Sequence, residues 1–498
     1  MNNTSDPSAG ATVAHNARNT NEDTAAMGKD ATRKLARHAA TIEYEALPPA
    51  LVTLMKQCVL DTLGVAIAAS TLAPESRIVA DYVMDLGGKP ESTVLGFGGK
   101  APAPWAVFVN GTLGHVLDYD TIGEGGHVAV VTVPVAFALA EKSGGTTGQQ
   151  LIAAVAAGTD IHTRLSQSID IPDWSQAEGW LATQLLGYVS GAATAGRLMK
   201  LNEKQMENAL GIAFNQLSGS RQMGVGVATD MRAMQAGFSG QGAILAAQLA
   251  QRGLTGPKKM IEGRHGLFRN YVRTDKPNWD ALVGKLGTRF PLLATNGFKV
   301  WPCCGDIRPS NTAIMQMRHE HKLRPEDIES IVVIGGSGGT KLLSEPIETK
   351  RRPKTSIDAK YSIPFTTAVM MAKGNVRLRD YTDEGLHDPA TLAMADRVSY
   401  RAAPETAKKF SGKIPWSGVG LVAVEIRTKD GRVFRRQPDS VPGDPKSPVS
   451  QKLLEEKFRD CVSFSAKPVP RRNIDRVIEM IRDLENVVDA TEIIRLLA

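Results

Sequence analysis

The stretch that decides the fold is Asn110–Ala140, with the sequence NGTLGHVLDYDTIGEGGHVAVVTVPVAFALA. It joins a polar cluster, a glycine-rich bend and a histidine to the apolar run Val128–Ala140 without a spacer. This run is too short, and too interrupted by Pro134, to span a bilayer as a helix. We therefore predict a helix that is buried on most faces and enters the core directly behind His127.

The polar part of the stretch has the composition of an acid–base site. Asp118, Asp120 and Thr121 lie within nine residues of His127. A titratable ring held at the start of a buried helix, beside carboxylates and a hydroxyl, can take up and release protons. The simpler alternative is that the two aspartates and the threonine only cap helix ends and turns. Spacing alone leaves both interpretations open.

Length and composition indicate an ordinary globular protein of two or three domains. The chain has 498 residues, of which 42% are hydrophobic and 22% charged. The net charge of +7 weakly favours anionic partners, but lysine and arginine are scattered along the chain, so we predict no nucleic-acid partner. The four cysteines are too few for a disulfide scaffold. Adjacent Cys303 and Cys304 lack the spacing of a common zinc site, so no metal is predicted.

The start of the chain and its hydropathy bear on location. Residues 1–30 are polar and contain no apolar segment of the signal-peptide type, which predicts a disordered tail. We identify no transmembrane run, and the cysteine content suits reduced thiols. The prediction is a cytoplasmic protein without a membrane partner.

The hydrophobic pattern divides the chain into a large helical part and a smaller mixed part. Helical spacing dominates residues 31–296 and returns in residues 441–498. Between them, residues 297–440 contain the strand-like segment Ile328–Ile334 and a hairpin pattern around Asp430-Gly431. We therefore predict a mainly α fold, in which an α+β domain is inserted into a large all-helical domain.

Several motifs together resemble those of the MmgE/PrpD family. In chain order they are LDTLGV at 60–65, Asn110-Gly111 with His115–Thr121, the His127 segment, ALGIAFNQLSG at 209–219, residues 253–257, FKVWPCC at 298–304 and YSIPF at 361–365. The family includes 2-methylcitrate dehydratases, cis-aconitate decarboxylases and iminodisuccinate epimerases. The resemblance implies a homodimer whose helical domain carries an α+β lid, with the active site in the cleft between the two. It also implies small di- or tricarboxylate substrates and no metal or organic cofactor.

The resemblance assigns roles to four residues. The family's Asp/Thr/His cluster matches Asp118, Thr121 and His127, and the family's lysine before the Pro-Cys turn matches Lys299. An imidazole, with a reference pKa of about 6.5, can give and take protons at neutral pH. We therefore expect His127 to transfer the proton. Asp118 is expected to orient the His127 ring or to tune its pKa. Thr121 is expected to bind a substrate oxygen, and Lys299 to bind a carboxylate or carry a proton.

Five positions depart from the family pattern. Leu181 stands where relatives often carry a second catalytic histidine, and Arg232 and Gln235 stand where they carry a lysine and a histidine. Phe365 replaces a tyrosine, and Arg308 replaces the histidine after the Pro-Cys turn. Arginine stays protonated, so it can clamp a carboxylate but cannot act as a base. The site therefore keeps its cations and loses proton carriers.

These observations together predict a function and leave two alternatives. We expect Arg232, Arg308, Gln235 and Asp120 to bind the substrate. The predicted protein is a cofactor-independent lyase or isomerase that removes a proton next to a carboxylate of a small di- or tricarboxylate. Its class is a carbon–oxygen lyase (hydro-lyase) or a related decarboxylase or epimerase. One alternative is a catalytically silent family member that binds a carboxylate or regulates a partner enzyme. The other is a purely structural dimer, which would bind no ligand.

Overall fold

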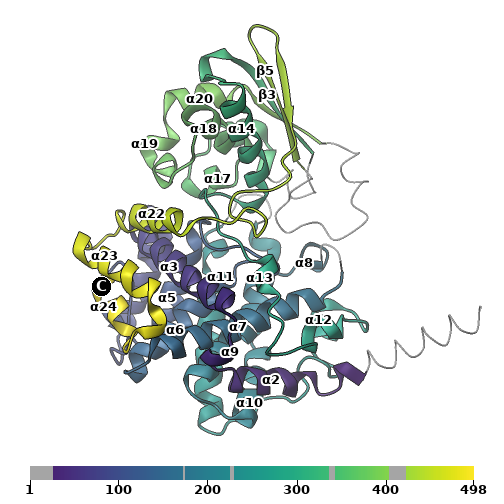
Figure 1. The fold of residues 1–498 in the computed structure, drawn as a ribbon, viewed down its shortest axis with the longest axis vertical. Helices are drawn as coiled ribbons and strands as arrows, with labels where there is room; N and C mark the ends of the chain where they lie inside the picture. Colours follow the sequence, from purple (N-terminus) through teal and green to yellow (C-terminus); the bar gives the residue numbers. More distant parts are fainter. Residues whose placement is uncertain (1–25, 172–173, 225–228, 336–342, 403–421) are drawn as a thin grey trace, which may run out of the picture.

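The computed structural model describes residues 26–171, 174–224, 229–335, 343–402 and 422–498. The predicted tail, residues 1–30, lies outside these ranges except for residues 26–30, which form a helical turn before the first labelled helix. Figure 1 shows a large helical body with a smaller unit of helices and strands above it. The chain is thus mainly α with a smaller α+β unit, as predicted.

The body is built from helices of the first three hundred residues and of the last fifty. They are α2 (Ala31–Thr41), α3 (Pro49–Leu72), α4 (Pro74–Leu86), α5 (Ala103–Val116), α6 (Ala129–Ser143), α7 (Gly148–Ser168), α8 (Trp174–Ala177), α9 (Ala182–Leu198), α10 (Glu203–Phe214), α11 (Met231–Gln251), α12 (Trp279–Val283), α13 (Leu292–Thr295), α22 (Gln451–Val462), α23 (Arg471–Arg482) and α24 (Thr491–Leu497). A two-stranded pair, β1 (Ser92–Thr93) with β2 (Lys100–Ala101), lies before α5.

The predicted buried helix is confirmed as α6. Every residue from Ala129 to Ala140 is buried, because α5, α7, α9 and α11 all pack against this helix. An apolar run without a polar face needs neighbours on all sides, and the surrounding helices supply them. The chain segment just before α6, which carries His127, is therefore fixed at the start of a core helix.

Close packing of α5 against α11 positions part of the site. A Cβ atom on Gly111 of α5 would lie 2.9 Å from the carbonyl oxygen of Ala236 in α11. A Cβ atom on Gly237 would lie 2.4 Å from the carbonyl oxygen of Phe108. Only glycine allows the two backbones to approach this closely. As a result the last turn of α5, with His115, lies beside the first turn of α11.

The smaller unit is a four-stranded sheet with helices packed against it. Its strands are β3 (Ile328–Gly335), β4 (Val398–Arg401), β5 (Val422–Thr428) and β6 (Val433–Arg436), in the spatial order β4-β3-β5-β6. Its helices are α14 (Arg308–Glu320), α16 (Ile347–Arg351), α17 (Ser356–Lys360), α18 (Ile363–Lys373), α19 (Asp383–Leu386) and α20 (Pro389–Ala395). The β3–β4 pair is parallel, whereas β3–β5 and β5–β6 are antiparallel. The predicted hairpin is confirmed, with Gly431 at a φ of 88° in its turn.

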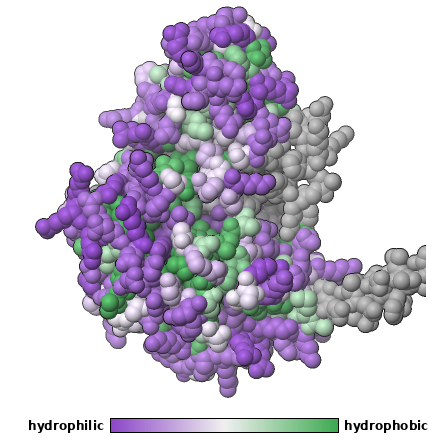
Figure 2. Space-filling view, viewed as in Figure 1, coloured by the Kyte–Doolittle hydropathy of each residue, from purple (hydrophilic) through white to green (hydrophobic). Residues whose placement is uncertain are grey.

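The end of the chain returns to the helical body, where α22 and α23 pack against α3 (Figure 1). Of the described helices, α3 is the one long and apolar enough to cross a membrane, but 78% of its most apolar window is buried inside the protein. It is therefore a core helix of the body. Figure 2 shows a largely hydrophilic smaller unit, with apolar residues gathered over the middle of the visible face.

Candidate active site

The loop between α5 and α6 carries an aspartate in a strained conformation. Asp118 has a φ of 50°, in the left-handed region that costs a non-glycine residue about 1–2 kcal/mol. The ammonium of Lys299 donates to its carbonyl oxygen at 2.8 Å and lies 2.5 Å from its Oδ1 atom. Backbone hydrogen bonds between Ile122 and Gly297, at 3.0 and 2.8 Å, hold the lysine's segment against this loop. The ion pair therefore fixes the strained turn.

Asp120 hydrogen-bonds two histidines at once. Its Oδ2 lies 2.7 Å from Nδ1 of His127, and its Oδ1 lies 3.3 Å from Nδ1 of His115. Because a carboxylate only accepts, both Nδ1 atoms carry the hydrogen, which leaves Nε2 of each ring as an acceptor when the ring is neutral. The backbone N–H of His127 donates to the Thr183 hydroxyl at 3.0 Å. Asp120, and not Asp118 as expected from the resemblance, thus orients the ring of His127 in the manner of a catalytic aspartate, because Asp118 is paired with Lys299.

The charges around these histidines are set by burial and by their partners. Burial raises the pKa of Asp120, but His127 and His115 outweigh it and hold this pKa well below its usual range. Burial lowers the pKa of His115 to about 4, although Asp120 opposes the shift. Neutral His115 then accepts at Nε2 from Gln235, at 2.7 Å, and from Arg232. Asp120 is therefore a carboxylate, and His115 is a neutral ring.

Two cations converge on Asp118, opposite His127. Nε2 of His127 lies 3.9 Å from Oδ1 of Asp118, and Arg232 approaches the same oxygen to 4.0 Å. Burial pushes the pKa of Asp118 upward, but Lys299 and Arg232 outweigh it and hold this pKa well below its usual range. The Lys299 side chain is fully buried, whereas that of Arg232 is 21% exposed. We call His115, Asp118, Asp120, His127, Arg232 and Lys299 the Asp118 cluster.

Several polar atoms at the cluster lack a hydrogen bond. Among the described residues, no well-aligned partner exists for Oδ2 of Asp118, for the Thr121 hydroxyl or for the Tyr361 hydroxyl. The Tyr361 ring lies 5.8 Å from the Arg232 guanidinium, and burial raises the pKa of its hydroxyl well above the usual value. Buried polar atoms are nearly always hydrogen-bonded in folded proteins. The Tyr361 hydroxyl also interacts with the Asp118 side chain, so these two groups lie together and are suited to bind a polar ligand next to Arg232.

The structure brings together most, but not all, of the residues predicted from the sequence. His127, Asp118, Asp120, Lys299, Arg232 and Gln235 are joined by the contacts above, and the Thr121 carbonyl accepts from Nδ1 of His127 at 3.1 Å. Arg308 is different: its guanidinium binds Asp444 and the carbonyl oxygen of Pro442, and none of its described contacts reaches the cluster.

Two departures from the family pattern, Leu181 and Phe365, lie outside the Asp118 cluster. Leu181 precedes α9, two residues before Thr183, which holds the backbone of His127. Phe365 is fully buried in the core of the smaller unit, 6.3 Å from the Tyr381 ring. The hydroxyl beside Arg232 comes instead from Tyr361, four residues earlier.

Sequence reasoning assigned no role to four residues that belong to the site or adjoin it. His115 begins the motif His115–Thr121, and Tyr361 begins the motif YSIPF. A histidine and a tyrosine in these motifs were the signal that could have indicated both residues as part of the site. Lys360 precedes Tyr361 and is 2% exposed. Arg221 lies close enough to Arg232 for that charge to lower its pKa, second to burial. No local pattern distinguishes these two cations from surface lysines and arginines.

One group could geometrically hold a metal ion. His115, Asp120 and His127 each offer a ligand atom, and these atoms lie within 4.8 Å of one another. The same atoms already form the Asp–His hydrogen bonds, and the outer nitrogen of His115 faces Gln235 and Arg232. A metal would have to replace both hydrogen bonds and lie near a guanidinium. The donor set fits a hydrogen-bonded triad better than a metal centre.

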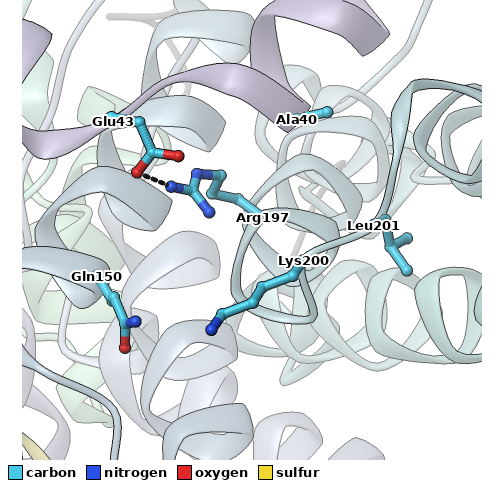
Figure 3. Close-up of a pocket in the computed structure, with 6 residues that line it drawn as sticks. All are labelled: Ala40, Glu43, Gln150, Arg197, Lys200 and Leu201. Carbon is cyan, nitrogen blue, oxygen red and sulfur yellow. Dashed lines mark hydrogen bonds and ion pairs between the residues drawn. The ribbon is translucent and has the colours of Figure 1, made fainter.

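A pocket lies apart from the cluster. It is lined by Ala40, Glu43, Gln150, Arg197, Lys200 and Leu201. Figure 3 shows Lys200 and Gln150 extending into it, while the Arg197 guanidinium is paired with Glu43. Arg197 also donates to the carbonyl oxygen of Ile42 at 2.6 Å. None of its lining residues belongs to the Asp118 cluster, so the pocket is not part of the candidate active site.

Comparison with known proteins agrees with the resemblance seen in the motifs. The model of the MmgE/PrpD N-terminal domain matches residues 33–280, and that of the MmgE/PrpD C-terminal domain matches residues 301–483. The chain is 22% identical to a cis-aconitate decarboxylase of Homo sapiens over 95% of both chains. It is 23% identical to that of Mus musculus, over 95% of this chain and 94% of the relative. The cis-aconitate decarboxylase of Aspergillus terreus is also 23% identical, over 94% of this chain and 95% of the relative.

Proposed function

Because the chain belongs to the MmgE/PrpD family, we propose that it is a lyase acting on a small di- or tricarboxylate by proton transfer next to a carboxylate. The observation that carries the proposal is the position of His127. Its Nδ1 is fixed by Asp120 at 2.7 Å, and its Nε2 faces Asp118 among the cations Lys299 and Arg232. A base with a fixed tautomer beside two cations, one of them fully buried, suits proton abstraction from an anionic substrate.

Each group has a chemical task in this proposal. Nε2 of His127 takes the proton from the carbon next to the substrate carboxylate, and Asp120 stabilises the imidazolium that forms. Arg232 binds a carboxylate, and the Tyr361 and Thr121 hydroxyls bind further substrate oxygens. The charge of Lys299, shared with Asp118, stabilises the enediolate that develops. No step of this scheme requires a metal or an organic cofactor.

The relatives suggest where to begin the search for the substrate. The relatives named above are called cis-aconitate decarboxylases, so cis-aconitate is the first acid to test. Arg232 and Gln235 stand where the family carries a lysine and a histidine. The groups that can give or take a proton in this chain therefore differ from those of its relatives. Dehydration, decarboxylation and epimerisation are therefore all included in the assay.

The experiment is turnover of an acid panel followed by proton NMR in heavy water. The panel contains cis-aconitate, 2-methylcitrate and related di- and tricarboxylates, and deuterium incorporation detects C–H cleavage even without net product. We expect His127→Ala to abolish turnover, since general acid–base help is worth roughly 10²–10⁴-fold. His387→Ala is the matched control, because the His387 side chain is 73% exposed in the smaller unit. Prior dialysis against a chelator is expected to leave turnover unchanged.

Two outcomes would count against the proposal. Full activity of His127→Ala would remove the assigned base. Thermal stabilisation by a carboxylate without turnover of any panel member would favour the catalytically silent alternative. The predicted homodimer and cytoplasmic location stay predictions, and light scattering after size-exclusion chromatography tests the first.

A further inference from the structure

Lys360 is a buried lysine whose charge has no obvious structural partner. It ends α17 and is 2% exposed. Its ammonium lies 5.9 Å from the centre of the Tyr381 ring, and within the described part of the chain it makes no hydrogen bond or ion pair. Burying an unpaired charge destabilises a folded protein. A buried cation kept under these conditions calls for a functional explanation.

The backbone places Lys360 at the Asp118 cluster. Its carbonyl oxygen accepts from the N–H of Cys304 at 3.0 Å, in the segment that also carries Lys299. The next residue, Tyr361, has its ring beside Arg232. In Figure 1, α17 lies at the base of the smaller unit, where that unit meets the helical body. The backbone of Lys360 therefore adjoins the cluster from the smaller unit, whereas His127 belongs to the body.

The charges that act on Lys360 come from both parts of the protein. Burial lowers the pKa of Lys360 to about 8. Glu75 of α4 and Asp118 oppose this shift, and Lys299 adds to it. An amine with such a pKa is mostly protonated at neutral pH and can still release its proton, unlike an exposed lysine with a pKa of about 10.4.

We propose that Lys360 is the second proton carrier of this site and acts as the general acid opposite His127. The inference rests on the proposed function and adds a residue to it. When His127 has taken a proton from carbon, or when CO₂ has left, the electron pair remains on the substrate. That pair, or a departing hydroxide, takes a proton from the Lys360 ammonium. An N–H bond breaks, a C–H or O–H bond forms, and the neutral amine regains its proton from water. Where His127 has taken the proton from carbon, its imidazolium returns that proton to water.

This role accounts for the departures from the family pattern. At positions 181 and 235 this chain has a leucine and a glutamine where relatives carry histidines that could donate a proton. Arg232 holds its proton too tightly to donate it. Lys360 supplies the missing acid from a different element. The competing explanation is that Lys360 only attracts a substrate carboxylate, a task for which any permanent cation suffices.

A pair of substitutions separates the two roles. Lys360→Met removes both charge and proton, whereas Lys360→Arg keeps the charge but cannot release a proton near neutral pH. We expect kcat to fall at least about 100-fold in both variants, with KM much less affected. Lys373→Met is the matched control, because Lys373 lies in α18 of the same unit and is paired with Asp380 at 2.9 Å. Wild-type kcat in Lys360→Met, or restoration of kcat by arginine, would overturn the inference.

A second measurement does not depend on turnover. Reductive methylation with ¹³C-formaldehyde, followed by NMR titration of the intact protein, reports the ionisation of each lysine. We expect one signal that titrates near pH 8 and is missing in Lys360→Met. If Lys360 titrates like an exposed lysine, the inference is wrong even where turnover is found. If the wild type turns over no acid although this signal is present, the proposed function fails and the ionisation of Lys360 stands.

Discussion

Lys457 offers the sharpest test of how the fold positions the site. It lies on α22, in the last part of the chain, and its ammonium is 2.6 Å from Oδ1 of Asp61 in α3. It also donates to the carbonyl oxygens of Tyr119, at 2.6 Å, and Lys299, at 2.9 Å. Tyr119 stands between the two aspartates of the cluster. One ammonium therefore holds both backbone segments that carry the ion pair of Asp118 and Lys299.

The magnitude of the expected effect depends on which partners are removed. Burial raises the pKa of Asp61 although Lys457 opposes the shift, so this pair carries a large desolvation cost. Lys457→Met leaves a buried acid without its partner, and should lower the free energy of unfolding by about 3–5 kcal/mol. In Asp61→Asn/Lys457→Met no charge is left unpaired. Only two carbonyl acceptors lose their donor, at about 1 kcal/mol each, so the double variant should be about 2 kcal/mol less stable than the wild type.

Activity is expected to respond differently from stability. Without Lys457 the Tyr119 and Lys299 backbones lose a shared anchor, and a displacement of about 1 Å at a reacting group can cost about 100-fold in rate. We therefore expect a low kcat in the double variant although its stability is largely restored. Asp61→Asn alone retains the two backbone hydrogen bonds, and its kcat should stay closer to that of the wild type.

The assay is urea unfolding together with kcat on the acid identified in the panel. The matched control is Lys56→Met/Glu485→Gln, which removes another ion pair between α3 and the end of the chain, at 2.8 Å, without touching the cluster. Its kcat should equal that of the wild type. A wild-type kcat in Asp61→Asn/Lys457→Met would refute the reasoning, because the pair would then serve stability alone.

Two further predictions concern acid stability and the source of the site's hydroxyl. Burial lowers the pKa of His115 and of His162 to about 4, whereas an unfolded histidine has a pKa of about 6.5. Between these values the unfolded chain binds more protons, so the free energy of unfolding should fall as pH drops from 6.5 to 4, by roughly 3 kcal/mol for each histidine. Urea titrations at several pH values measure this, and a flat profile over that window would contradict it. Tyr361→Phe should lower kcat/KM about tenfold by removing a substrate hydrogen bond. Phe365→Tyr should not raise kcat/KM, because the Phe365 ring is fully buried in the core of the smaller unit. Steady-state kinetics would disprove this if Phe365→Tyr were more active than the wild type.

Local sequence patterns were sufficient for much of the fold. The continuous apolar run predicted α6, since a helix without a polar face has to be buried. The strand-like segment Ile328–Ile334 predicted β3, and the Asp-Gly pair predicted the hairpin between β5 and β6. These features depend on residues close in sequence, so their physical cause is visible without coordinates.

The candidate site could be predicted only in part. Asp118, Asp120 and His127 lie on one short loop, where spacing alone brings them within reach of one another. Arg308 carried the expected charge, yet its guanidinium pairs with Asp444 in the structure. The sequence offered no means of knowing which carboxylate this arginine would meet.

By itself, then, the sequence determined the helical body, the smaller α+β unit, the family and the loop that carries His127. The tertiary structure alone decided that Lys299 binds Asp118, that Lys360 is buried, and that Lys457 anchors two distant segments. Lys299 and Asp118 are 181 positions apart in the sequence, and Lys457 and Tyr119 are 338 positions apart. The physical reason is that the environment of a charged side chain is set by helices packing against each other, whereas local periodicity reports only which face of a segment is apolar.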